Sequence, residues 1–148
     1  MIHIETDRLI LRTVPLAALA STAAGNIKPT KALVGEHLSE EWFEDAWVYQ
    51  LRHDQWIADP SYAPWSVRAI ASKETGDIVG NMNCHHKPMP FALDGNEFLA
   101  VEMGYTVFEP WRRQGIAFEA IRAFTAWAKT EGVAAVILSI SPENNPSL

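Results

Sequence analysis

The sequence predicts an α/β (α+β) fold in which helices flank a mixed, mostly antiparallel central sheet. Short apolar runs typical of strands occur near residues 8–13, 65–72, 78–85 and 98–108. The last of these runs leads through a short turn into an amphipathic helix and another apolar run, the order of a parallel crossover unit. The 148 residues are 48% hydrophobic and 20% charged, which favours a single domain over residues 1–148 with its own core.

The N-terminal part is expected to hold one strand followed by helices. In the strand at 8–13, Leu9 and Leu11 share one face. Residues 15–57 are predicted to be helical and irregular. Ser39 precedes two glutamates and is predicted to cap a helix. One apolar face of this region is expected to comprise Trp42, Ala46, Tyr49 and Leu51. Residues 59–64, with two prolines, are predicted to end the region as a loop.

Three antiparallel strands are predicted next, at 65–72, 78–85 and 98–108. The first two are joined by a turn at Gly76, and Pro110 is expected to stop the third. Residues 87–96 contain two prolines and an Asp-Gly-Asn sequence, and they are predicted to form a longer hairpin loop.

The helix after residue 115 has the clearest pattern. Its predicted core stripe consists of Ala117, Ala120, Ile121, Phe124, Trp127 and Ala128. Gly132 is placed to end it. The final strand, at 133–141, is expected to be buried on both faces because of its apolar run.

The turn between strand and helix, residues 112–117, favours an anionic ligand. Two arginines and a glycine stand where a helix N-terminus presents backbone N–H groups and partial positive charge. The spacing excludes a P-loop and a dinucleotide-binding glycine motif. The alternative to anion binding is an ordinary basic turn that is exposed to solvent.

A known family has a similar turn. The pyrophosphate-binding loop of the GNAT superfamily of N-acetyltransferases reads Arg or Gln, two residues, Gly, one residue, then Gly or Ala, and residues 112–117 resemble it. The resemblance implies an acyl-CoA N-acyltransferase (GNAT) fold and acetyl-CoA as cosubstrate. The implied cofactor-binding residues of the loop are Arg112, Arg113, Gln114, Gly115, Ile116 and Ala117. Independently, residues 5–12 resemble the start of the branch that acetylates N-termini of ribosomal proteins (Rim-type).

The C-terminal segment, residues 141–148, is similar to the family's Glu-Asn-x-x-Ser segment. In relatives this segment begins another helix, followed by a strand pair, so the chain is expected to be C-terminally incomplete and to lack those elements. The uncovered last strand makes a homodimer an open possibility. The resemblance implies that Asn144 binds the cofactor or substrate, and the alternative is turn chemistry. Ser147 either assists the departing thiolate or caps the absent helix.

Acetyl transfer to an amine requires a base and a polarised thioester carbonyl. By resemblance, the backbone of Tyr105, Thr106 and Val107 pairs with the pantetheine arm. Glu102 is the first candidate for the base, and it shares a strand face with Gly104. The alternative for Glu102 is a carboxylate on a solvated strand face.

Other reactive side chains carry weaker expectations. Cys84 is expected to be a packing residue rather than a nucleophile. His85 and His86, adjacent on a predicted strand, are expected to point to opposite faces and not to chelate together, and no spacing suggests a metal. Glu119 is either the branch's helix glutamate or a first-turn dipole partner. Two roles are considered for the tryptophans: packing in the core, or forming the walls of the acceptor pocket. The tryptophans concerned are Trp42, Trp47, Trp56, Trp65 and Trp111.

The amino-acid composition and net charge exclude some classes of function. The formal net charge is −6, which argues against nucleic-acid binding and suits a cationic amine. The single cysteine fits a cytoplasmic protein, and neither a secretory signal nor a membrane span is expected. The leading hypothesis is an acetyl-CoA-dependent N-acetyltransferase for a protein N-terminus or small-molecule amine. The alternatives are a non-catalytic acyl-CoA-binding module and an interaction domain.

Overall fold

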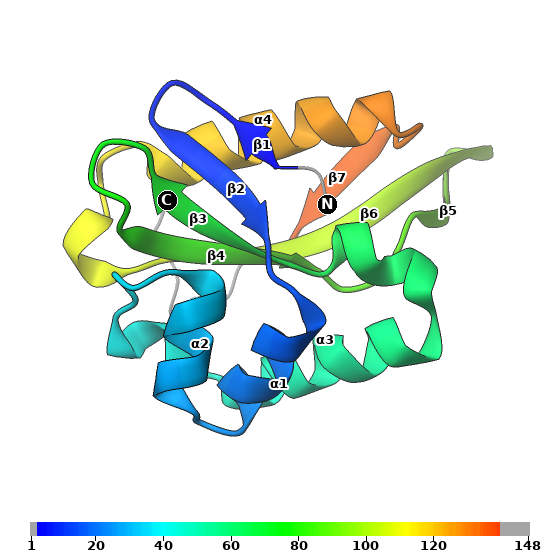
Figure 1. Cartoon of the computed structure of the whole chain (residues 1–148). Helices are drawn as coiled ribbons and strands as arrows, with labels where there is room; N and C mark the ends of the chain where they lie inside the picture. The colour runs from blue at the N-terminus through cyan, green and yellow to red at the C-terminus, as the bar shows by residue number, and fades with distance from the viewer. Residues whose placement is uncertain (1–2, 140–148) are drawn as a thin grey trace.

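A mixed sheet forms the centre of the protein, whose computed structural model describes residues 3–139 (Figure 1). Within these residues the sheet has seven strands in the order β1-β2-β3-β4-β6-β5, and β7 pairs with β6 on its other edge. The strands are β1 (Ile4–Glu5), β2 (Leu9–Thr13), β3 (Val67–Ser72), β4 (Ile78–Cys84), β5 (Met89–Leu93), β6 (Asn96–Val107) and β7 (Ala135–Leu138). Every pairing is antiparallel except that of β6 with β7. The predicted fold class is confirmed.

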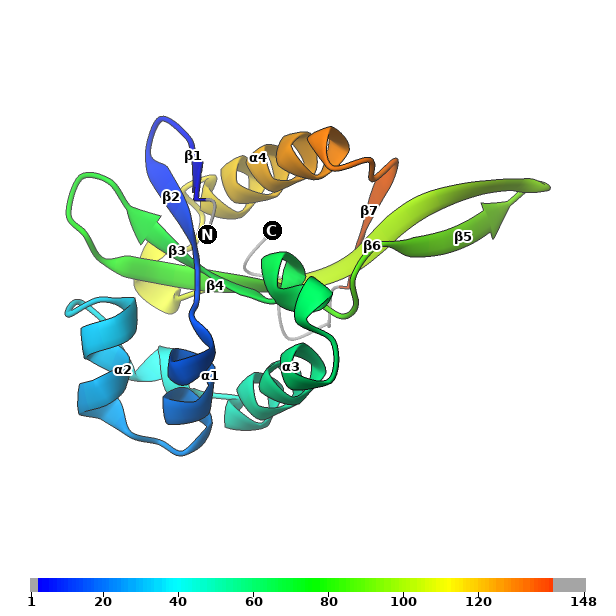
Figure 2. The ribbon, with the colours of Figure 1, turned by 45° about the vertical axis from the view of Figure 1, so that its right-hand side comes forward.

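Helices cover both faces of the sheet, and Figures 1 and 2 show α4 on one face and α1 to α3 on the other. The α-helices are α1 (Leu16–Ala23), α2 (Ile27–Val34), α3 (Ala46–Ala58) and α4 (Ile116–Thr130). Three 3₁₀ helices are η1 (Glu40–Phe43), η2 (Pro60–Trp65) and η3 (Glu109–Trp111). No helix within residues 3–139 is both long and apolar enough to cross a membrane.

The alternation of β6 divides the interior into two cores. Val101, Met103 and Tyr105 point to the α4 side, where they pack with Phe124 and Ala128 of that helix. The predicted core stripe of α4 lies here. The even-numbered residues of β6 point to the side of α1 to α3, where the second core gathers around Trp42 and Phe108. The residues of β6 on this second face include the polar Glu102 and Thr106.

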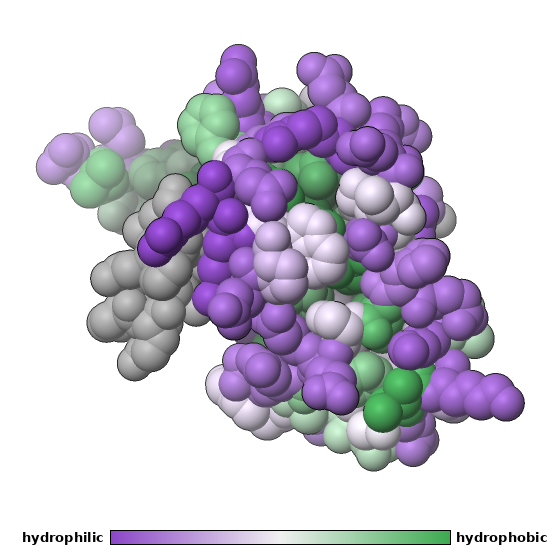
Figure 3. Space-filling view, turned by 90° about the vertical axis from the view of Figure 1, so that its left-hand side faces the viewer, coloured by the Kyte–Doolittle hydropathy of each residue, from purple (hydrophilic) through white to green (hydrophobic). Residues whose placement is uncertain are grey.

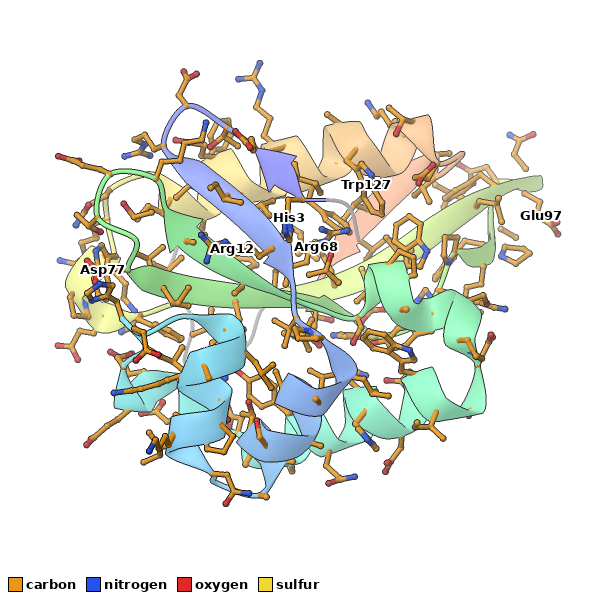
Figure 4. All side chains as sticks on the ribbon, viewed as in Figure 1. His3, Arg12, Arg68, Asp77, Glu97 and Trp127 are labelled. Carbon is orange, nitrogen blue, oxygen red and sulfur yellow. The ribbon has the colours of Figure 1, made fainter. Side chains whose placement is uncertain are left out.

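A buried arginine lies between the sheet and α4, and Figure 4 shows Arg68 beside Trp127. Its guanidinium carbon is 4.7 Å from the centre of the Trp127 ring, and its side chain is only 2% exposed. Arg68 also donates to the Thr13 hydroxyl and the Pro64 carbonyl. Burial lowers the pKa of Arg68 to about 10, so the side chain stays charged at neutral pH. These contacts join β2, β3, η2 and α4.

Several local predictions are wrong, each because tertiary contacts override the local signal. Residues 89–93 form the strand β5 instead of a loop, since the backbone of this segment pairs with β6 from Asn96 to Ala100. Figure 2 shows the resulting hairpin extending away from the rest of the sheet. Strand β7 ends at Leu138 and is half-buried rather than buried on both faces, because it has a strand partner on one edge only among residues 3–139.

Errors also occur in the helical region. Ser39 makes no side-chain capping bond, and the segment after it is only the 3₁₀ helix η1. Leu51 is 43% exposed and does not belong to the apolar face of Trp42 and Tyr49. The expected loop at 59–64 is mostly the 3₁₀ helix η2, in which the Asp59 carboxylate accepts from the Ser61 backbone N–H. A short strand, β1, which was not predicted, precedes β2.

Candidate active site

Strand β6 loses its neighbour part-way along one edge. β7 pairs with it only from Ala100 to Met103, and the last contact is the Ser139 N–H donating to the Met103 carbonyl at 2.9 Å. Bonds to β4 involve even-numbered residues, as in the Phe108 N–H donating to Val79. Odd-numbered residues therefore present their backbone groups to the β7 side. Among residues 3–139, no strand pairs with this edge beyond Ser139, where Tyr105 and Val107 direct their backbone groups; we call this part the open edge of β6.

The three predicted backbone residues are thus not equivalent. Tyr105 and Val107 face the open edge, whereas the backbone of Thr106 faces Asn81 of β4. The Val107 carbonyl accepts from Arg112 Nε at 2.9 Å, which ties the turn to the strand end. The backbone N–H of Tyr105 points toward this open edge of β6.

The turn after η3 brings backbone donors next to this edge. Arg113 has φ 65° and Gly115 has φ 77°, so the chain twice enters the left-handed region before α4 begins at Ile116. No side chain among the described residues caps α4, and its first i→i+4 bond is from the Glu119 N–H to the Gly115 carbonyl. The N–H groups ahead of Glu119 are therefore oriented toward one spot.

The predicted cofactor-binding residues of the turn differ in whether their side chains or only their backbone groups are exposed. Arg113 and Gln114 are exposed, and Gln114 donates to the Pro110 carbonyl at 3.3 Å. Ile116 and Ala117 bury their side chains in the α4-side core, so only their backbone N–H groups reach the turn surface. Asn144 and Ser147 lie outside the described residues.

The two separate sequence resemblances meet at the first turn of α4. The Glu119 carboxylate accepts from the Thr6 hydroxyl, from the Arg8 backbone N–H at 3.1 Å and from Arg8 Nε at 2.7 Å. This leaves an Arg8 terminal nitrogen 3.6 Å from where a Cβ on Gly115 would stand. Glu119 therefore does more than complement the helix dipole, because it holds a third arginine beside the turn.

Two open hollows flank Arg8. One, of about 440 Å³, is lined on opposite sides by Lys73 of the β3–β4 turn and by Trp111 and Gln114. The other, of about 570 Å³, runs along α4 past Phe118, which is 70% exposed, and Arg122. Figure 3 shows the side of the molecule that carries η3 and the β3–β4 turn, where hydrophilic side chains surround a smaller, less polar area. An elongated anionic ligand with an apolar end fits this combination.

Replacing Glu119 by glutamine should lower the free energy of unfolding at pH 7 by about 1–2 kcal/mol, since one partner, Arg8, is half-exposed. Burial alone would raise the pKa of Glu119, but hydrogen bonds from Thr6 and Arg8 lower it overall. The stabilisation is therefore complete above the ordinary value of 4.5 and is lost as the pH falls through the lower folded value. Urea unfolding at pH 7 and below pH 4.5 measures this difference. Glu131→Gln, at the far end of α4, is the control, and equal losses in both variants would contradict the role.

Glu102 is held in a cluster on the face of β6 that looks toward α3. Its carboxylate accepts from Ser139 Oγ at 2.5 Å and lies 3.3 Å from His85 Nδ1. Its backbone N–H donates to His86 Nε2 at 3.3 Å. The Ser139 hydrogen bond, with His85, holds the pKa of Glu102 below its usual value. Solvent alone therefore does not surround Glu102. Both histidines contact it, His85 at the carboxylate and His86 at the backbone N–H.

An acidic pocket of about 80 Å³ lies on the same face. Its carboxylates are those of Glu41, Glu44 and Asp45, and its floor includes Thr106 and the β4 asparagines. Asn81 donates to the Tyr49 hydroxyl at 2.8 Å, and Arg52 donates to Asn83 at 2.8 Å. A cationic group is electrostatically favoured in this pocket.

The remaining candidates are structural. Burial raises the pKa of Cys84 to about 12, which makes it a poor nucleophile. Trp42 and Trp65 are buried, Trp47 is 68% exposed, and Trp111 lines the hollow beside Arg8. None of the tryptophans lines the acidic pocket. Among residues 3–139, no group of three or more His, Cys, Asp or Glu side chains could hold a metal ion.

Comparison with known proteins agrees with this architecture. The sequence model of the acetyltransferase (GNAT) domain matches residues 8–148. No curated protein sequence is significantly similar to the chain.

Solved structures share the fold at low sequence identity. They include an acetyltransferase from Agrobacterium tumefaciens (TM-score 0.59, 21% identity) and a GNAT-family acetyltransferase from Bacillus anthracis (0.53, 18%). A ribosomal-protein-S5-alanine acetyltransferase from Vibrio fischeri has a TM-score of 0.60 and 16% identity. Each comparison covers 99% of this chain and 78% of the other. Since the family match extends over nearly the whole sequence, the chain belongs to the GNAT acetyltransferase family.

Proposed function

We propose that the chain is an N-acetyltransferase that moves an acetyl group from acetyl-CoA to a primary amine by direct attack in a ternary complex. The observation that carries this proposal is the open edge of β6 directly beside the uncapped N-terminus of α4. Family membership supports acetyl transfer in general, and the geometry supplies the reason for a CoA thioester as donor.

The donor would lie across the open edge and the turn. Its pyrophosphate would accept from the N–H groups of residues 113–118, with Arg8 and Arg113 adding charge. Its pantetheine arm would pair with Tyr105 in the manner of an added strand. The exposed Phe118 ring offers a stacking surface in the hollow along α4 for the nucleotide base.

The acceptor would approach from the α3 side of the sheet. The acidic pocket there contains Thr106, which lies next to Tyr105 on β6, so the pocket and the open edge meet around one short strand segment. Its carboxylates attract an ammonium group, whether of a protein N-terminus or of a small amine. The donor would therefore reach this strand segment along its edge and the acceptor from its α3 face, which would bring the two reactants together there.

Turnover tests the proposal. The chain, incubated with acetyl-CoA and a panel of small amines and peptide N-termini, should release thiol only when an amine is present, and mass spectrometry should find the acetylated amine. Acetyl-CoA binding without turnover would instead indicate an acyl-CoA-binding module. No binding would contradict the interpretation of the turn.

Arg113→Ala should weaken acetyl-CoA binding about tenfold, as expected for one lost phosphate contact. Arg113 is exposed, so the substitution removes charge without opening the core. Calorimetric titration measures the change. Arg12→Ala is a matched control, because Arg12 lines a separate hollow with His3 and Leu33 and its loss changes the net charge equally. Similar affinities for both variants would contradict a pyrophosphate site at the turn.

A further inference from the structure

A histidine stands where β6 parts from β7. His85 follows β4, and its backbone N–H donates to the Glu102 carbonyl at 2.8 Å, which continues the β4–β6 pairing by one residue. Its own carbonyl accepts from the Gln55 side chain at 2.8 Å, and Gln55 in turn accepts from Arg52. The position of His85 is thus determined by both β6 and α3.

The two ring nitrogens of His85 have different surroundings. Nδ1 lies 3.3 Å from a carboxylate oxygen of Glu102, which Ser139 also contacts. Nε2 lies over Gly104, 3.6 Å from where a Cβ on that residue would stand. Because the carboxylate favours a proton on Nδ1, the lone pair is left on Nε2. Gly104 immediately precedes Tyr105, whose N–H begins the open edge.

The charges around His85 keep it neutral. Burial lowers its pKa most, and the positive charge of Arg52 on α3 lowers it further, as does His86. The Glu102 carboxylate opposes these effects without overcoming them. At neutral pH the imidazole can therefore accept a proton. Glu102 is the weaker base of the two, because the Ser139 hydrogen bond stabilises its ionised form.

The side chain also lies on the same sheet face as the acidic pocket. Asn83, two residues before His85 on β4, lines that pocket and is held by Arg52. Since alternate residues share a strand face, Asn83 and His85 point to the same side, as do Glu102 and Gly104 on β6. His85 therefore lies between the part of β4 that lines the acidic pocket and Gly104, the residue before Tyr105.

We propose that His85 is the general base of the acetyl transfer and that Glu102 is a positioning residue that orients its ring. This role rests on the proposed N-acetyltransferase function and replaces Glu102 as the base. Nε2 takes one proton from the substrate ammonium and passes it to solvent. The free amine then attacks the thioester carbonyl, a C–N bond forms and the C–S bond breaks. The second amine proton ends on the thiolate, so the products are the acetamide, free CoA and one proton.

His85→Gln should lower kcat about 100-fold, a typical contribution of a general base, while acetyl-CoA affinity stays unchanged. In the wild type, kcat/KM should rise with pH through a midpoint below 6.5, and His85→Gln should lose this step. Glu102→Gln removes a charge that raises the His85 pKa, so its midpoint should move to lower pH. Added imidazole should partly restore the rate of His85→Ala.

The control is His53→Gln. His53 also pairs with a carboxylate, at 3.1 Å from Asp54, but it lies within α3. The kcat and the pH profile of His53→Gln should match those of the wild type. NMR titration of His85 should give the same midpoint as the kinetics.

Three outcomes would overturn the role of His85. An active wild type with an unchanged pH profile in His85→Gln would exclude His85 as the base and leave the proposed function intact. A 100-fold loss in Glu102→Gln with little loss in His85→Gln would restore Glu102 as the base. A wild type that acetylates no amine at all would overturn the proposed function, and this role with it.

Discussion

Replacing Gly115 by glutamate is expected to weaken acetyl-CoA binding by at least 100-fold. Gly115 has φ 77°, where a side chain is strained by about 1–2 kcal/mol, and it lies among the N–H groups at the start of α4. A carboxylate here would repel the pyrophosphate and would also lie close to Arg8, whose terminal nitrogen is 3.6 Å from the Cβ position. The substitution therefore fills the space beside the turn and adds a negative charge that also neutralises Arg8.

Two further variants separate these effects in the calorimetric titration. Gly25→Glu is matched in charge and backbone conformation, with φ +73° and nothing within 4 Å of its Cβ, and it should bind like the wild type. Gly115→Ala keeps the strain without the carboxylate and should lose far less affinity than Gly115→Glu. If Gly115→Glu binds acetyl-CoA as well as Gly25→Glu does, the turn is not the pyrophosphate site.

Gly80→Ala is expected to have the largest effect on stability, a loss of about 3 kcal/mol. A Cβ at Gly80 would stand 2.2 Å from the Thr106 carbonyl oxygen and 3.2 Å from Val107 Cα. These are backbone atoms of the paired strand, so β4 and β6 must separate locally to admit the methyl group. Urea unfolding measures the loss.

Gly104→Ala provides the comparison on the facing strand. Its Cβ would meet nothing closer than His85 Nε2 at 3.6 Å, which is ordinary contact, so its stability should fall by less than 1 kcal/mol. If both variants lose the same free energy of unfolding, close approach of the β4 and β6 backbones at Gly80 is contradicted.

Structural features that depend only on residues close together in the sequence could be predicted. The strand, turn and helix around Gly115 could be predicted because a period-2 pattern, two arginines with a glycine and a helical stripe follow one another directly. The parallel pairing of β6 with β7 also followed from this local order. The link between Arg8 and Glu119 was not predicted, because contact between residues so far apart in the chain has no local signal.

The His85 cluster was not predictable because it depends on register. Which residue of β4 faces Glu102, and where β7 stops, are decided by pairing across the sheet and not by neighbours in the chain. Both histidines lie beyond the end of β4 at Cys84, and the contacts of their rings with Glu102 across the sheet were not predicted. The pairing register of β4 with β6 brings His85 next to Gly104. A sequence-based prediction of that register would have been needed to find the cluster.

Hydrogen exchange at the backbone amide of Tyr105 tests the central claim most directly. Tyr105 faces the open edge of β6, whereas Thr106 faces β4, so the two neighbouring amides form an internal comparison. On saturation with acetyl-CoA, exchange at Tyr105 should slow at least tenfold, while exchange at Thr106 should barely change. Saturable acetyl-CoA binding that leaves exchange at Tyr105 unaltered would show that the donor does not lie along β6.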